Sequence, residues 1–204
     1  SEWTGTVYIR ADGSIDPPDA PLHRDGNVYT LTGNITSSGD GIVVERDNII
    51  IDGAGYTLEG GGIGTSEYRY KGVYLNGRSN VTIKNTIITM FFYGIEFSSS
   101  SKNSIVGNNI ANNYFGIRLD SSSNNSIFGN NIANNGNGIS VDSSSKNSIF
   151  HNNFIDNTEQ VSPKRPSNVW DDGYPSGGNY WSDYTGVDAD GDGIGDTSYV
   201  IDEN

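Results

Sequence analysis

The chain repeats itself every 22 residues, and this period constrains its fold more than any other feature. Glycines open four successive units at positions 72, 94, 116 and 138. Isoleucines recur at the same interval, at Ile83, Ile105, Ile127 and Ile149. An earlier copy begins at Gly41, and an insertion at about residues 61–71 separates it from the others. A fixed period of this length is typical of stacked repeat architectures.

Each unit contains three short apolar stretches, as at residues 116–119, 125–128 and 130–133. Alternating apolar positions in short runs predict half-buried strands, and the density of Gly, Asn, Ser and β-branched residues disfavours helices. One unit cannot bury its apolar side alone, whereas stacked units share a core. The sequence therefore predicts an all-β fold, a single-stranded right-handed parallel β-helix with three short strands per 22-residue coil and about five to six coils.

Equivalent positions of successive coils should lie above one another. The apolar columns should point inward, and stacked asparagine amides should hydrogen-bond along the axis. The predicted asparagine columns are Asn103, Asn125 and Asn147; Asn109, Asn131 and Asn153; and Asn113, Asn135 and Asn157.

The two ends of the chain depart from the repeat and predict caps. Residues 1–26 are rich in Pro, Asp and Gly and predict a loop-rich N-terminal cap with one strand at residues 4–10, paired within its own chain or with a neighbour. The coils occupy residues 27–157. Residues 158–204 concentrate aromatic side chains and predict a C-terminal cap that covers the last coil.

Composition excludes several function classes. The formal net charge of −13 opposes binding to nucleic acid. There is no Cys, which removes disulfides and thiolate chemistry. No apolar run is long enough to span a membrane. The chain begins at Ser1 without Met, which predicts a processed secreted or cell-surface protein, although a trimmed chain would look the same.

An acidic loop near the C-terminus predicts a metal site. Asp188, Asp190 and Asp192 alternate along the chain, Gly193 permits a sharp turn, and the carbonyl of Ile194 and the side chain of Asp196 follow. This order of oxygen ligands opens an EF-hand-type loop, so we expect Ca²⁺ as the ion that fastens the C-terminal cap. The twelfth position is Tyr199 in place of a bidentate Glu. The alternative is a solvated acidic loop.

One pair of carboxylates is a candidate catalytic centre. Asp120 and Asp142 share a column and are the weak catalytic candidates, since paired acids can hydrolyse glycosides. No His or Arg lies one period away from them. Glu96 and Arg118 are neighbours in another column and are more simply a cross-strand ion pair.

Aromatic residues gather at one corner of the coils. Phe92 should stack with Tyr114, and Tyr93 with Phe115, forming a surface for sugar rings or a protein partner. The alternative is that some of these rings cover the core. The sequence also contains three candidate glycosylation sites, at Asn34, Asn80 and Asn124.

The segments "NSIFGNNIANN", "NIIIDGAGYTLEG" and "NVWDDGYPSGGNYWSDYTGVDADGDGIGD" resemble the NosD-like, or CASH, parallel β-helix repeat proteins of archaeal and bacterial surfaces. The resemblance extends from about Val28 to Asp202. The acidic loop also resembles thrombospondin type 3 and dockerin calcium loops. The family's name-giving member is linked to copper delivery, but His23, His151 and a single Met supply few copper ligands here.

These observations favour a non-catalytic extracellular structural or adhesive protein, and they predict that it self-assembles end to end into a filament or layer. Its expected partners are further copies of itself and a cell-surface polysaccharide. The alternative is a carbohydrate-active enzyme of the β-helix type, a polysaccharide lyase or glycoside hydrolase, or a carbohydrate-binding module.

Overall fold

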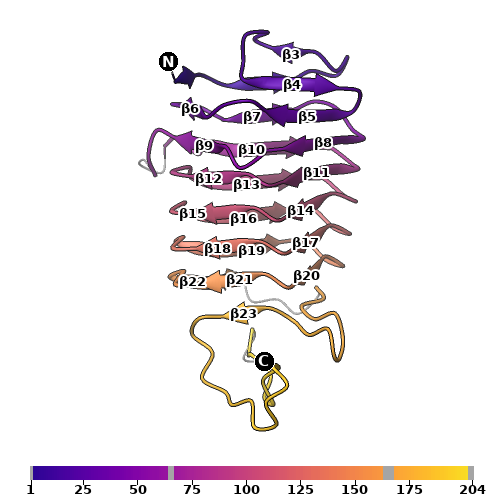
Figure 1. Ribbon diagram of the computed structural model, residues 1–204, viewed down its shortest axis with the longest axis vertical. Helices are drawn as coiled ribbons and strands as arrows, with labels where there is room; N and C mark the ends of the chain where they lie inside the picture. Colours follow the sequence, from indigo (N-terminus) through magenta and orange to yellow (C-terminus); the bar gives the residue numbers. More distant parts are fainter. Residues whose placement is uncertain (1, 64–66, 163–167, 202–204) are drawn as a thin grey trace.

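The structure is a stack of short strands that forms a three-sided parallel β-helix of about six coils. The computed structural model describes residues 2–63, 67–162 and 168–201. Figure 1 shows the coils piled along the long axis, with the N-terminus at one end and an extended cap at the other. Among the described residues, no helix has the length and hydropathy needed to cross a membrane. The predicted all-β, right-handed parallel β-helix is confirmed.

Three sheets form the sides of the prism, and each coil contributes one strand to each sheet. In order across sheet A the strands are β1 (Trp3–Thr4), β6 (Ile35–Ser37), β9 (Thr57–Gly60), β12 (Ile87–Thr89), β15 (Asn109–Ala111), β18 (Asn131–Ala133), β21 (Asn153–Ile155) and β23 (Tyr180–Trp181). In sheet B they are β3 (Ile15–Asp16), β2 (Val7–Ile9), β7 (Ile42–Val44), β10 (Lys71–Asn76), β13 (Tyr93–Ser98), β16 (Phe115–Asp120), β19 (Asn137–Asp142) and β22 (Glu159–Ser162). In sheet C they are β4 (Leu22–Asp25), β5 (Val28–Leu31), β8 (Ile49–Asp52), β11 (Val81–Lys84), β14 (Ser104–Val106), β17 (Ser126–Phe128) and β20 (Ser148–Phe150).

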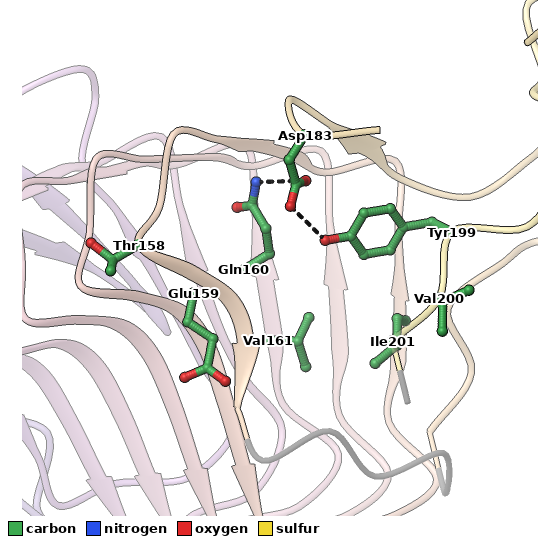
Figure 2. Close-up of a pocket in the computed structure, with 8 residues that line it drawn as sticks. All are labelled: Thr158, Glu159, Gln160, Val161, Asp183, Tyr199, Val200 and Ile201. Carbon is green, nitrogen blue, oxygen red and sulfur yellow. Dashed lines mark hydrogen bonds between the residues drawn. The ribbon is translucent and has the colours of Figure 1, made fainter. Parts of the chain in front are cut away.

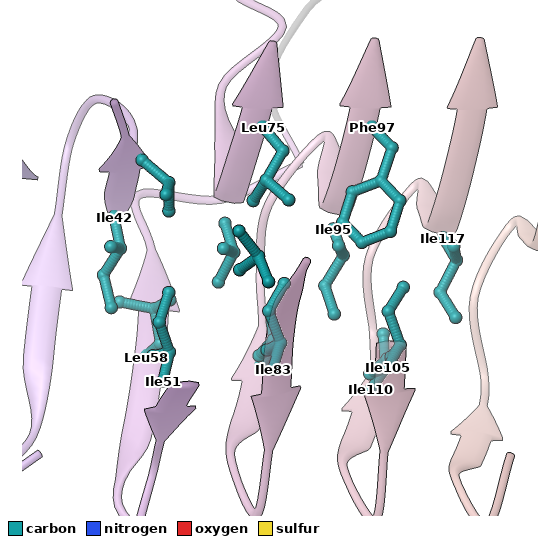
Figure 3. Packing of buried hydrophobic residues seen from close by; sticks show 14 of the residues in the cluster. Ile42, Ile51, Leu58, Leu75, Ile83, Ile95, Phe97, Ile105, Ile110 and Ile117 are labelled. Atoms are coloured by element: carbon teal, nitrogen blue, oxygen red, sulfur yellow. The ribbon is translucent and has the colours of Figure 1, made fainter. Parts of the chain in front are cut away.

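The 22-residue period sets the register of the parallel ladders. Residues Ile83, Ile105, Ile127 and Ile149 are paired in succession through sheet C, and each is fully buried. Sheets A and B contribute equivalent buried files to the same core, as Figure 3 shows for the middle coils. The predicted inward columns are therefore confirmed.

Buried asparagines connect the coils at the corners between sheets. Asn130 lies between β17 and β18, where its Oδ1 accepts a hydrogen bond from the backbone N–H of Asn108 at 3.0 Å. Its Nδ2 donates to the carbonyl of Ile105 at 2.9 Å and to Oδ1 of Asn152 at 2.9 Å. Each amide thus satisfies backbone groups that a tight corner would otherwise bury without partners.

Two of the three predicted asparagine columns form such buried ladders, those of Asn103 and Asn113. The column of Asn109 does not, because its members belong to the outer face of sheet A, where Asn131 Nδ2 donates to Asn109 Oδ1 at 3.2 Å. The third buried ladder is one residue earlier, at Asn108, Asn130 and Asn152. The period is the same for both columns, so spacing alone cannot distinguish them.

We predict that Asn130→Ala lowers the free energy of unfolding by about 2–4 kcal/mol, because it leaves the buried N–H of Asn108 and carbonyl of Ile105 without partners. Asn109→Ala is the matched control: its side chain is exposed, and the change should cost about 0.5 kcal/mol or less. Urea unfolding of both variants measures the difference. Equal losses would contradict a structural role for the buried ladder.

The N-terminal cap contains four strands where the sequence predicted one. Gly5 has a φ of 135° and separates β1, in sheet A, from β2, in sheet B. Both strands pair with their own chain, β1 with β6 and β2 with β7. Strands β3 and β4 then run antiparallel to β2 and β5. The outermost strand of sheet C, β4, carries exposed His23, Arg24 and Asp25, which oppose addition of another strand to this edge.

The C-terminal cap continues the interior of the coils without the 22-residue period. Trp181 stacks on Phe154 with ring centroids 4.5 Å apart, and Tyr199 stacks on Trp181 at 4.2 Å. Asn168 and Asn179 extend two of the asparagine ladders by accepting hydrogen bonds from Asn147 and Asn152. Residues 163–167 and 202–204 of the predicted cap, and 64–66 of the predicted insertion, lie outside the described residues.

Candidate functional site

The outer face of sheet B carries a group of five charged residues, which we call the charged row: Lys71, Glu96, Arg118, Asp120 and Asp142. Strands β10, β13, β16 and β19 supply them from successive coils. The parallel register places Glu96 beside Arg118 and Asp120 beside Asp142. Charged side chains of four coils therefore meet on one face.

Arg118 is the centre of the charged row. Its Nε lies 3.5 Å from Oε1 of Glu96, and its Nη2 lies 3.6 Å from Asp120 and 3.8 Å from Asp142. The expected Glu96–Arg118 pair is present. The basic neighbour of the two aspartates does not lie one period away from them, where the repeat would place it. Arg118 precedes Asp120 by two residues on the same strand, and residues two apart share a face of a strand.

Glu96 is the least accessible carboxylate of the charged row, with 7% of its surface exposed. Burial raises its pKa above the usual value, while the charges of Lys71 and Arg118 act in the opposite direction. The Nζ of Lys71 is 4.0 Å from Oε2 of Glu96. Burial of Glu96 was not foreseen from the sequence, since outward positions of a sheet normally face solvent.

Because its pKa is raised in the folded state, Glu96 contributes stability at low pH that is lost as the pH rises through the raised pKa. Glu96→Gln has no charge to bury. We therefore predict that its free energy of unfolding increasingly exceeds that of the unmodified protein as the pH is raised from about 4 to about 8. Thermal unfolding across this range measures the difference. Glu59→Gln, at an exposed position of sheet A, is the matched control. A stability difference for Glu96→Gln that falls with rising pH would contradict the assignment.

The aromatic corner consists of Phe92, Tyr93, Tyr114 and Phe115 and lies beside the charged row. Phe92 and Tyr114 stack with centroids 4.7 Å apart, and Tyr93 and Phe115 at 5.3 Å. Phe92 and Tyr93 are buried, whereas Tyr114 is 45% exposed. The guanidinium of Arg118 lies 5.6 Å from the ring of Tyr93 and so connects the two groups. Phe92 and Tyr93 are therefore packed into the protein, whereas the ring of Tyr114 is accessible to a ligand.

Residues of the insertion approach the same corner. The guanidinium of Arg69 lies 5.6 Å from the ring of Phe92. Tyr68 and Tyr70 stack on one another, and both are exposed. The backbone of Tyr93 also donates a hydrogen bond to the carbonyl of Tyr70 at 3.1 Å, so the insertion adds exposed aromatic surface and one cation to this corner.

The acidic loop brings three of its predicted ligands together. One carboxylate oxygen each from Asp188, Asp190 and Asp192 lies within 4.8 Å of the others. Backbone N–H groups of Gly193, Gly191 and Asp192 donate to Asp188 and lower the pKa of its carboxyl. Asp196 instead accepts a hydrogen bond from the backbone N–H of Ala189 at 2.6 Å. Backbone donors thus stabilise the carboxylate of Asp188 among its acidic neighbours.

A small, partly open polar cavity of about 140 Å³ lies between the C-terminal cap and β22. Figure 2 shows Asp183 between two donors: Gln160 Nε2 donates to it at 3.1 Å, and the Tyr199 hydroxyl at 3.0 Å. Burial, and then this contact with Asp183, raises the pKa of Tyr199. The hydrogen bonds of Gln160 and Tyr199 with Asp183 thus fasten the cap to the last coil.

The three glycosylation candidates occupy exposed positions at turns or strand ends. Asn80 and Asn124 have positive φ angles of 54° and 59°. Asn34 Oδ1 accepts a hydrogen bond from the backbone of Thr57 at 2.9 Å. Exposure leaves all three accessible, and their modification stays a prediction.

Fold and surface together define a capped parallel β-helix with a mixed polar and aromatic side face. The sequence model of one protein family, described as "Periplasmic copper-binding protein (NosD)", matches residues 5–186. The chain belongs to the NosD family. A search of curated proteins finds no match to the chain.

This family assignment corrects one prediction from the sequence. The family is described as copper-binding, which points to copper instead of Ca²⁺. The expectation of Ca²⁺ as the cofactor is therefore wrong. The acidic spacing of residues 188–196 is not specific for Ca²⁺, because alternating carboxylates also organise a turn by accepting hydrogen bonds from backbone N–H groups.

The side chains of this chain do not fit a copper site of the usual kind, which uses imidazole or sulfur ligands. His23 lies on β4 in the N-terminal cap, whereas His151 follows β20 at the opposite end of the coils. His151 Nε2 is 2.8 Å from the carbonyl oxygen of Ser176. Within the described ranges, the only group of three His, Cys, Asp or Glu ligands is the aspartate set of the acidic loop, whose oxygens suit harder ions.

Proposed function

We propose that the chain is a non-catalytic β-helix module of the periplasm or cell surface that attaches to an envelope polymer through the outer face of sheet B. The family is described as periplasmic, which supports the location. The observation that carries the proposal is the exposed ring of Tyr114, which stacks on Phe92 in the aromatic corner. This corner reaches the charged row through Tyr93, whose ring lies 5.6 Å from the guanidinium of Arg118. Open aromatic surface beside charged groups is typical of binding surfaces.

Rigidity of the coils supports attachment by this face. Parallel ladders fix β13, β16 and β19 in register, and buried files of isoleucine and asparagine lie behind them. A preorganised surface loses little conformational entropy when it binds, so even a small contact can contribute to affinity. The exposed charged residues of β4 disfavour strand addition at the N-terminal end, so attachment by the side of the prism is favoured over its ends.

One observation favours the alternative, a polysaccharide lyase or glycoside hydrolase. Arg118 lies beside the paired carboxylates Asp120 and Asp142, as acid–base chemistry on a sugar requires. The same contacts neutralise these carboxylates by ion pairing, which is the structural role expected of a cross-strand cluster. We therefore favour binding over catalysis.

We predict that the purified protein cosediments with insoluble bacterial envelope fragments and releases no sugar products from them. Tyr114→Ala should reduce the bound fraction several-fold, because it removes the open ring. Tyr174→Ala, which removes a ring that is 78% exposed on the C-terminal cap, should leave the bound fraction unchanged.

Two outcomes of this experiment contradict the proposal. One is equal loss of binding in the two tyrosine variants. The other is release of reducing ends or unsaturated sugars that disappears in the Asp120→Asn, Asp142→Asn double variant, which would establish the enzymatic alternative.

A further inference from the structure

The charged row has hydrogen-bonding capacity that the described protein does not use. The contacts of Arg118 with Glu96, Asp120 and Asp142 span 3.5–3.8 Å, longer than hydrogen bonds between charged groups. Within the described chain, no group donates a hydrogen bond to Glu96, although nine-tenths of its side chain is buried. From the described residues, the carboxylates of Asp120 and Asp142 accept hydrogen bonds only from the adjacent serine hydroxyls, at 3.1 and 3.4 Å.

Donors and acceptors alternate on this face. Lys71 and Arg118 offer several N–H groups, while Glu96, Asp120 and Asp142 offer carboxylate oxygens. A ligand that matches both must donate and accept at closely spaced points. Neighbouring hydroxyl groups do so, because each hydroxyl has one donor and two acceptor sites.

The aromatic corner adds an apolar element to the same surface. From Phe115 to Asp120 strand β16 spans about 17 Å at roughly 3.3 Å per residue. Tyr114, next to Phe115, is the most exposed ring of the corner, and Asp120 is at the far end of the strand. A short chain of rings with apolar faces and hydroxyl edges could contact Tyr114 at one end and the carboxylates at the other.

Charge selects among ligands of this kind. The row holds three carboxylates against two cations, and the whole chain has a formal net charge of −13. An acidic polysaccharide would approach against this field, whereas an uncharged one would not. Uncharged hydroxyls can donate hydrogen bonds to the carboxylates and accept them from the guanidinium, and neither requires charge on the ligand.

We infer that the charged row and Tyr114 together form a binding site for an uncharged glycan, with the pyranose face on Tyr114 and hydroxyls bonded to Arg118, Asp120 and Asp142. This inference rests on the proposed function and names the class of polymer that the side face recognises.

Native affinity electrophoresis tests the site, with mannan, dextran or lichenan in the gel as uncharged probes and polygalacturonate or alginate as acidic probes. The full chain should be retarded by at least one uncharged polysaccharide and by neither acidic one. Tyr114→Ala, Arg118→Gln and the Asp120→Asn, Asp142→Asn double variant should each weaken the retardation at least tenfold in apparent affinity.

Matched controls remove the same groups elsewhere. Tyr174→Ala removes an exposed ring, Lys102→Gln removes one exposed cation, and the Asp19→Asn, Asp25→Asn double variant removes two exposed carboxylates. Each should be retarded like the unmodified chain. Thermal unfolding of every variant verifies that the coils are intact, and Lys71→Gln replaces Arg118→Gln if the latter does not fold.

The inference is overturned if no uncharged polysaccharide retards the protein, if only the acidic ones do, or if control and site variants lose retardation equally. Its failure can be distinguished from failure of the proposed function. Envelope binding that depends on Tyr114 but persists in excess uncharged polysaccharide would retain the proposed function and reject the glycan as its target.

Discussion

The buried amide ladder is the interaction on which the rest of the structure depends. A triangular coil must turn sharply between sheets, and each turn directs backbone N–H and carbonyl groups toward the interior. Asn108, Asn130 and Asn152 satisfy these groups from coil to coil with contacts of 2.9–3.1 Å. Without these amides, the corners would bury unpaired polar groups, at a cost that the isoleucine files of a narrow core could not easily offset.

The same ladder explains why the side face can hold an ordered site. Once the corners are fastened, each strand of sheet B has a fixed register with its neighbours. Residues that differ between coils then meet at defined positions: glutamate in β13, arginine in β16, and aspartates at the ends of β16 and β19. Departures from the repeat on the outer face therefore supply the residues of the proposed binding surface, while the repeated residues inside supply stability.

The caps solve the problem of the open ends by different means. At the N-terminal end, β3 and β4 reverse direction and pair antiparallel, and β4 exposes charged side chains at the edge. At the C-terminal end, Trp181 and Tyr199 continue the core column above Phe154 as stacked rings. Asn168 and Asn179 take over the ladder positions although the repeat has ended. Their spacing to the preceding asparagines differs from 22 residues, so the period could not reveal them.

The sequence by itself determined the coil, its three strands, the buried isoleucine files and two asparagine ladders, because a parallel ladder converts a 22-residue spacing directly into contact. It also placed Glu96 against Arg118 and Phe92 against Tyr114 for the same reason. Tertiary structure alone decided which of two adjacent asparagine columns faces inward, since a period does not specify direction. It also decided that Arg118 forms ion pairs with Asp120 and Asp142 and that Glu96 is buried. In the acidic loop, it decided that backbone N–H groups donate hydrogen bonds to Asp188. Each of these depends on how side chains turn and what covers them, which the spacing of residues along the chain does not encode.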